Sequence, residues 1–330
     1  MAVTIAEIQK LRTMTGAGMM DCKKALAESE GDMEKAIELI RKRGQAIAAK
    51  RSDREASEGC VLAGEKDGFA AVLALKCETD FVAKNEDFIA LTRTILNHAL
   101  ATRPKNLDEL KNSTIDGRTV AELVTDRSGI TGEKMELDYY EFLEGGTVTT
   151  YVHPGNKLAT LVAFKEANAE YETIHEIAMQ VAAMNPIAVS EKDVPADYVE
   201  KEREIATEKT KAELIQKQVD AALQKAGINP AHVDSEEHIA SNIGKGWLTQ
   251  EQADQFHEIK ERVSAEKAAS LNENQIMQIA QGRLNKYFQE NALMLQEFVD
   301  SEDKSNVKAS IAKVDKDLTC TGFKRLELGA

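Results

Sequence analysis

Two segments of the sequence combine apolar side chains with charges in a way that suits binding to another protein. In the first, residues 11–26, a Gly-Ala-Gly turn is followed by Met19 and Met20, with Lys23 one helical turn further on. Consecutive helical residues point about 100° apart, so we expect one methionine to face a core and its neighbour to be exposed beside the lysines. The alternative is that both methionines pack in a small core and the lysines are only solvated.

The second segment, residues 78–85, reads Glu-Thr-Asp-Phe-Val-Ala-Lys-Asn and lies between an apolar strand and a helix. Loops at strand ends are displayed by a rigid scaffold, and Phe81 beside Asp80 would form a wedge with an apolar tip and a charge. In the alternative, Asp80 caps a turn and Phe81 packs inward. The residue types alone slightly favour inward packing.

Signatures of catalysis, nucleotide binding and metal binding are missing from the sequence. The glycines near 129–134 and 244–246 do not have the G-x-x-x-x-G-K-[ST] spacing of a phosphate-binding loop. His175-Glu176 and His257-Glu258 begin like zinc-protease helices, but each lacks the second histidine. We therefore expect no catalytic residue, no cofactor and no metal site, and interpret the protein as a non-enzyme. A catalytic site assembled only in space would escape this search.

Charge and cysteine content narrow the class of protein further. The 330 residues carry 42 Lys and Arg against 56 Asp and Glu, a net charge of −14, which argues against direct binding of nucleic acid. Residues 1–54 are an exception, with 11 basic and 8 acidic residues. Four scattered cysteines without a C-x-x-C pair, no signal-peptide pattern and no long apolar run indicate a cytoplasmic protein rather than a secreted or membrane one.

The hydrophobic periodicity predicts an α+β fold. Three short helices, starting at Thr4, Met19 and Asp32 and ending by Gly44, form a small bundle within residues 1–54, with a linker over 45–57. A hairpin around Lys66-Asp67-Gly68, a helix from Phe88 and a strand over 134–143 form a core subdomain over 55–143.

The same order of elements recurs further along the chain. A hairpin over 147–164 and a helix from 174 begin a second core subdomain, 144–194 with 292–330, in which 293–299 and 318–328 alternate like strands. Chance similarity of amphipathic segments is the alternative to a true repeat. Between the two parts, residues 195–291 are charged helices with narrow apolar stripes, which predicts an inserted antiparallel helical coiled-coil arm.

The two binding segments resemble the bacterial elongation factor Ts family. The family motif L-R-x-x-T-G-A-G-M-M-D-C-K-K-A-L stands at 11–26 and T-D-F-V-A-K-[DN] at 79–85, with weaker matches around His153, at 282–288, at 298–299 and at 321–329. This resemblance implies a ubiquitin-associated-like (UBA-like) N-terminal bundle, a core of two related subdomains and a helical insertion. The arm is longer than the usual insertion, so the resemblance assigns no role to about 207–270.

The resemblance also implies guanine-nucleotide exchange on elongation factor Tu as partner protein. The loop Thr79, Asp80, Phe81 and Val82 would disturb the partner's magnesium site. The remaining implied contacts are Arg12, Met19, Met20 and Lys23 in the bundle, and His153 and Val299 in the second subdomain. Asp300 stands where the family usually has an apolar residue. A UBA-like adaptor with a coiled-coil arm is the alternative function, and the arm could also mediate self-association.

Overall fold

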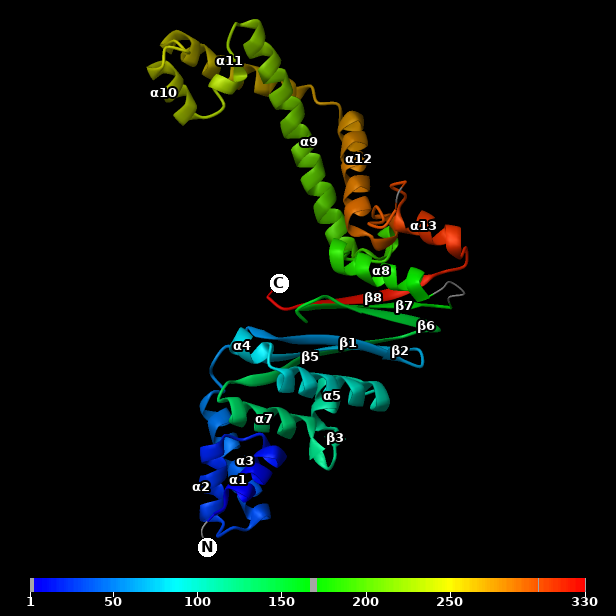
Figure 1. Cartoon of the computed structure of the whole chain (residues 1–330). Helices are drawn as coiled ribbons and strands as arrows, with labels where there is room; N and C mark the ends of the chain where they lie inside the picture. Colours follow the sequence, from blue (N-terminus) through cyan, green and yellow to red (C-terminus); the bar gives the residue numbers. More distant parts are fainter. Residues whose placement is uncertain (1–2, 167–170, 302, 330) are drawn as a thin grey trace. The chain divides into compact units, whose positions relative to one another are not determined.

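The computed structural model describes residues 3–166, 171–301 and 303–329. They divide into two compact units, Met1–Val189 with Gln296–Ala330, and Ser190–Leu295. The first unit contains the N-terminal helices and both three-stranded sheets, and the second contains the arm (Figure 1). No helix in the described ranges combines the length and the apolar character that crossing a membrane requires.

The N-terminal bundle consists of α1 (Ile5–Thr15), α2 (Met19–Glu28) and α3 (Met33–Lys50). The Thr4 side chain caps α1 in a reciprocal capping box with Glu7, and Asp32 caps α3, so the helices begin where the sequence predicts. The apolar faces meet in a small core of Ile8, Leu11, Ala17, Cys22, Ala25, Leu26 and Ala36.

The third helix does not end at Gly44, and the predicted linker is wrong for residues 45–50, which are helical. Gly44 instead lies inside α3 against Gly129 of α7 (Val120–Thr131). A Cβ atom added to Gly129 would lie 2.2 Å from the Gly44 Cα, so the two backbones approach too closely for a side chain at that position. Here glycine serves helix packing rather than helix termination.

The first sheet has the antiparallel order β1-β2-β5, with β1 (Glu58–Lys66), β2 (Phe69–Cys77) and β5 (Met135–Glu144). The predicted hairpin is confirmed: Asp67 and Gly68 both take positive φ, 50° and 73°, between paired strands. One face of the central strand β2 packs on α5 (Glu86–Thr102), and its other face packs on the second sheet. Both faces are buried, which explains its nearly continuous apolar run. The connecting elements before β5 are α6 (Leu107–Asn112), β3 (Thr114–Ile115), β4 (Arg118–Thr119) and α7.

The second sheet has the order β6-β7-β8, with β6 (Thr147–Val152), β7 (Leu158–Phe164) and β8 (Cys320–Glu327). Helix α8 (Tyr171–Met184) covers its outer face, as α5 covers that of the first sheet (Figure 1). The expected strand at 293–299 is wrong. These residues form the 3₁₀ turn η3 (Leu293–Leu295) and one bridge from Glu297 to Asn306. Phe298 and Gln296 are buried there, and the Gln296 amide donates to the Met184 carbonyl, so the alternation reflects local packing. Helix α13 (Val307–Val314) then leads to β8.

The arm contains α9 (Ala196–Lys225), α10 (Glu236–Gly244), α11 (Gln250–Ala269) and α12 (Glu273–Asn291), with short turns η1 (Glu191–Asp193) and η2 (Pro230–His232). Helix α9 packs against both α11 and α12, and Glu213 of α9 pairs with Arg283 of α12. Apolar residues of the narrow stripes in α9 and α11, Val219, Phe256, Ile259 and Val263, are buried. They belong to a core that also takes in Ile228, Val233, Ile239 and Leu248, so this part of the arm is a small helical domain rather than a two-helix hairpin.

Candidate protein-binding site

Residues 79–83 form a short turn after β2, from which the Phe81 side chain projects into solvent. Thr79 caps α4 (Asp80–Ala83), its hydroxyl accepting a hydrogen bond from Val82 N at 3.4 Å. Phe81 is 83% exposed, whereas Ala83 is buried and Val82 packs partly against the first core. The inward-packed arrangement of Phe81 is therefore wrong. We name residues Thr79–Val82 the wedge loop.

Asp80 lies beside Phe81 on the wedge loop and pairs with Lys84 one turn later, with 2.7 Å between Lys84 Nζ and Asp80 Oδ2. The hydrogen bond from Lys84 and its charge hold the pKa of the Asp80 carboxyl below its usual value. Asp80 is thus a carboxylate at neutral pH, and an exposed lysine is its present partner. A cationic group on another protein could replace that partner.

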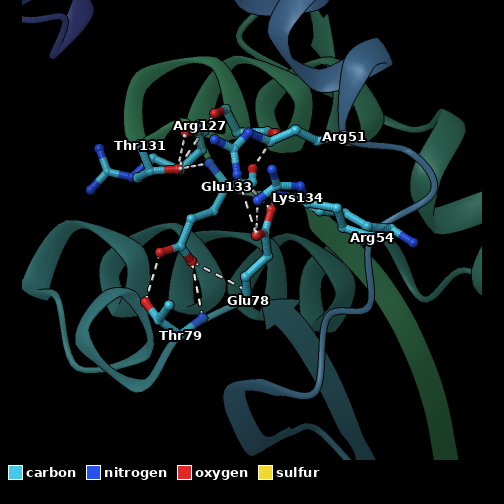
Figure 2. Close-up of polar contacts among 9 residues, drawn as sticks. Arg51, Arg54, Glu78, Thr79, Arg127, Thr131, Glu133 and Lys134 are labelled. Carbon is cyan, nitrogen blue, oxygen red and sulfur yellow. Dashed lines mark hydrogen bonds and ion pairs between the residues drawn. The ribbon is translucent and has the colours of Figure 1, made fainter.

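Two carboxylates hold the base of the wedge loop, as Figure 2 shows. Glu133, just after α7, accepts hydrogen bonds from Glu78 N at 3.2 Å, from Thr79 N at 3.1 Å and from the Thr79 hydroxyl at 2.6 Å. Glu78 accepts in return from Lys134 N at 2.6 Å. These bonds cross-link the segment that follows β2 to the segment that precedes β5, so Phe81 projects from a fixed base.

Two arginines from the end of the N-terminal bundle form ion pairs with Glu78. Arg51 and Arg54 each approach its carboxylate with N–O distances of 3.1 Å. Burial alone would raise the pKa of the Glu78 carboxyl, but the bonds from Lys134 N, Arg54 and Arg51 outweigh this effect and hold the pKa below its ordinary value. Glu78 is thus anionic and links the bundle to the wedge loop.

The bundle residues of the predicted contact are all exposed. Arg12 lies on α1, and Met19, Met20 and Lys23 lie on the first turns of α2. Met19 is 43% and Met20 63% exposed, so the expectation that one methionine faces the core is wrong. Cys22, Ala25 and Leu26 fill the core instead. Both flexible thioether side chains are free to contact another surface.

His153 and Val299 lie in the second subdomain. His153 follows β6, where its Nδ1 is 2.9 Å from the Tyr151 hydroxyl. Val299 is 64% exposed, and its backbone N donates to Gln180 Oε1 at 2.9 Å. Tyr151 also makes an edge-on ring contact with His175 of α8, and burial together with the nearby Asp300 raises the pKa of the neighbouring Glu176 carboxyl. His153 and Val299 each contact residues that lie on or next to α8: His153 through Tyr151, which packs on His175, and Val299 through Gln180.

The structure thus presents three exposed groups on the first unit: the α1–α2 residues, the wedge loop, and the pair His153 and Val299. Within the described ranges, no hydrogen bond, ion pair or ring contact joins one group directly to another. Sequence reasoning missed Glu133, Arg51 and Arg54, which position the wedge loop. Their partners lie 24 to 55 residues away in the chain, and no local pattern marks them.

Features that would support catalysis are weak in the described residues. The four cysteines are buried thiols outside any disulfide, and burial raises the pKa of Cys60 to about 11 and that of Cys77 to about 12. Such thiols stay protonated near neutral pH and are poor nucleophiles. Across residues 3–166, 171–301 and 303–329, no group of three or more His, Cys, Asp or Glu side chains is placed to hold a metal ion.

Comparison with known proteins shows which family of sequences this chain matches. The family model described as elongation factor TS matches residues 78–226 and 215–330. Proteins named elongation factor Ts from Parabacteroides distasonis, Phocaeicola vulgatus and Porphyromonas gingivalis are 57%, 56% and 47% identical to this chain. Each alignment spans the whole of both chains, so it includes the arm.

Proposed function

The chain belongs to the elongation factor Ts family, and on this premise we propose that it binds elongation factor Tu in complex with GDP and promotes release of the GDP. Membership of this family indicates a role in translation elongation. What we propose beyond that role is the nucleotide-exchange reaction. The observation that carries it is the exposed Phe81 on a fixed base, with the Asp80 carboxylate beside it.

The proposed mechanism is competition for the groups that hold the nucleotide. A G protein binds its nucleotide through a phosphate loop, a magnesium ion and contacts to the base. Insertion of the aromatic tip of Phe81 near this site, with Asp80 altering the charge around the magnesium ion, would weaken several of those contacts together. A protein that binds the nucleotide-free partner more tightly must, by thermodynamic reciprocity, weaken nucleotide binding by the same factor.

The other exposed groups would supply binding energy for this process. Met19 and Met20 offer apolar area, Arg12 and Lys23 offer positive charge, and His153 and Val299 offer a second contact. Because the contacts are separated on the surface, they could hold the partner while the nucleotide leaves and GTP binds. No covalent bond is made or broken, so the protein is not an enzyme under this proposal, and it acts in the cytoplasm, without direct contact to nucleic acid.

Mixing the purified protein with elongation factor Tu carrying a fluorescent GDP tests the proposal. We expect accelerated release at substoichiometric amounts, because an exchange factor dissociates and acts again. Unchanged release at equimolar protein would contradict the proposal and favour a UBA-like adaptor, which predicts binding without nucleotide release.

The role of the carboxylate is tested by magnesium dependence. Asp80→Ala should slow GDP release when magnesium is present and have much less effect once magnesium is chelated. Lys84→Ala is the matched control, since it removes the same ion pair but leaves the carboxylate in place. An equal effect of Asp80→Ala with and without magnesium would contradict the assigned role.

A further inference from the structure

We propose that Glu78 and Glu133 are positioning residues that connect the N-terminal bundle to the wedge loop, so that docking of the bundle on the partner also orients Phe81. This inference rests on the proposed function. It assigns a role in exchange to two carboxylates that lie behind the contact surface.

The Glu133 carboxylate determines how the wedge loop leaves the sheet. Its Oε1 accepts from the Thr79 hydroxyl, and its Oε2 accepts from the backbone N of Thr79 and of Glu78. The same Thr79 hydroxyl caps α4 by accepting from Val82 N. Three hydrogen bonds to one carboxylate restrict translation and rotation of this turn. A displacement of Glu133 would therefore be transmitted directly to the helix that carries Phe81.

The Glu78 carboxylate connects this base to the bundle. Its side chain is only 14% exposed, and Arg51, at the end of α3, is 29% exposed. Ion pairs sheltered from solvent are screened less by salt than surface pairs. Glu78 Oε1 also accepts from Lys134 N, the residue that follows Glu133. The two carboxylates thus exchange hydrogen bonds between the same two segments, and the arginines of the bundle join that network at Glu78 (Figure 2).

Elsewhere the bundle meets the core mainly through the packing of α3 on α7. Helix α3 meets α7 through the close approach of Gly44 and Gly129, and Arg41 of α3 forms an ion pair with Asp126 of α7 at 3.9 Å. Beside this contact is a cavity of about 530 Å³, lined by apolar residues that include Ile37, Ile40, Ile47, Leu123 and Ile130. Of these polar links between bundle and core, the one at the end of α3 is the link that reaches the base of the wedge loop, through Glu78.

The first test separates positioning from binding by the kinetics of GDP release. At saturating protein, Glu133→Ala should lower the maximal release rate about tenfold, as expected when a contact residue is misaligned rather than removed. The concentration that gives half-maximal release should stay within about twofold of the parent, because the docking residues are intact. Glu133→Gln should restore most of the rate, since its carbonyl oxygen can still accept from both backbone N–H groups and its amide can donate to the Thr79 hydroxyl.

The second test addresses the link to the bundle. The double variant Arg51→Ala/Arg54→Ala should also lower the maximal rate, and adding Glu133→Ala should then cost less than the product of the separate effects, because both act through one network. Lys42→Ala is the matched control. It removes an exposed ion pair of the same helix, with Glu38, that does not reach Glu78, and should leave the rate unchanged.

Hydrogen exchange in the free protein provides a readout that does not depend on the partner. Glu133→Ala should speed exchange of the amides of residues 78–83, two of which donate to Glu133 in the parent. Unchanged hydrogen exchange of residues 78–83 in Glu133→Ala would overturn the inference while leaving the proposed function intact. So would a maximal GDP release rate within about twofold of the parent in well-folded Glu133→Ala and Arg51→Ala/Arg54→Ala. If the parent itself does not accelerate GDP release, the proposed function fails and this inference fails with it.

Discussion

Truncation of Phe81 separates a binding role from a structural one. Fully burying a phenylalanine side chain is worth about 1.5–3 kcal/mol, and Phe81 is 83% exposed, so Phe81→Ala should cost this protein about 0.5 kcal/mol or less of its own stability. At about 2–4 °C per kcal/mol, the melting temperature should fall by no more than about 2 °C. If Phe81 enters the partner, the same change should cost about 2–4 kcal/mol in exchange, which is roughly 30-fold to 1,000-fold in rate.

Phe88, seven residues further on and fully buried, is the matched control. Phe88→Ala empties a site in the first core and should cost about 3–5 kcal/mol of stability, enough to lower the melting temperature by roughly 6–20 °C. Its exchange activity per folded molecule should remain near that of the parent. Thermal melts and stopped-flow release of fluorescent GDP from elongation factor Tu measure both quantities. A large melting loss for Phe81→Ala together with normal exchange per folded molecule would refute the binding role.

Three further changes test other parts of the structure. Gly129→Ala should destabilise the packing of the bundle on the core by about 1–3 kcal/mol, because the added Cβ would lie 2.2 Å from backbone. Gly44→Ala should be tolerated, because the atom nearest to its added Cβ is 3.4 Å away. Thermal melts of the two variants test this difference. Burial and the nearby Asp300 raise the pKa of the Glu176 carboxyl, so ionisation of Glu176 costs folded-state stability as the pH rises. Glu176→Gln should therefore raise the melting temperature at neutral pH and change it little below about pH 4, where the carboxyl is protonated in both states; an equal change at both pH values would contradict this assignment. Replacing residues 209–270 with a short connector should leave nucleotide exchange largely intact, because every predicted contact residue lies outside them. Complete loss of nucleotide exchange in a folded deletion would show that the arm acts on the nucleotide site. Sedimentation of the same variant tests self-association through the arm.

The elements that the sequence predicts well have local causes. Thr4 and Asp32 cap helices with their own side chains, and Asp67-Gly68 takes the positive φ values of a tight hairpin turn. These signals lie within a few residues of the element that they define, so they can be recognised without knowledge of the fold.

The predictions that were wrong or missing concern residues whose contact partners lie far away in the sequence. Gly44 looks like a helix terminator until Gly129 lies against it, and Glu133 has no local feature that marks it as the residue holding Thr79. Whether Phe81 points inward or outward is likewise decided by the space that surrounding elements leave. Residue types alone single out Met19, Met20 and Phe81, whereas Arg12, His153 and Val299 become proposed contact residues only through the family resemblance.

The pairing of β7 with β8 has a consequence for how the chain folds during synthesis. β7 ends at Phe164 and β8 begins only at Cys320, with the arm between them. At about 5–20 residues per second, the ribosome needs roughly 8–30 s to supply the missing strand, and meanwhile the free edge of β7 could pair with another nascent chain. The helices of the arm are consecutive in the chain between these two strands. By pairing α9 with α12, the arm shortens the effective loop between the strands from about 155 to about 60 residues, which lowers the entropic cost of closing the sheet by roughly 0.8 kcal/mol.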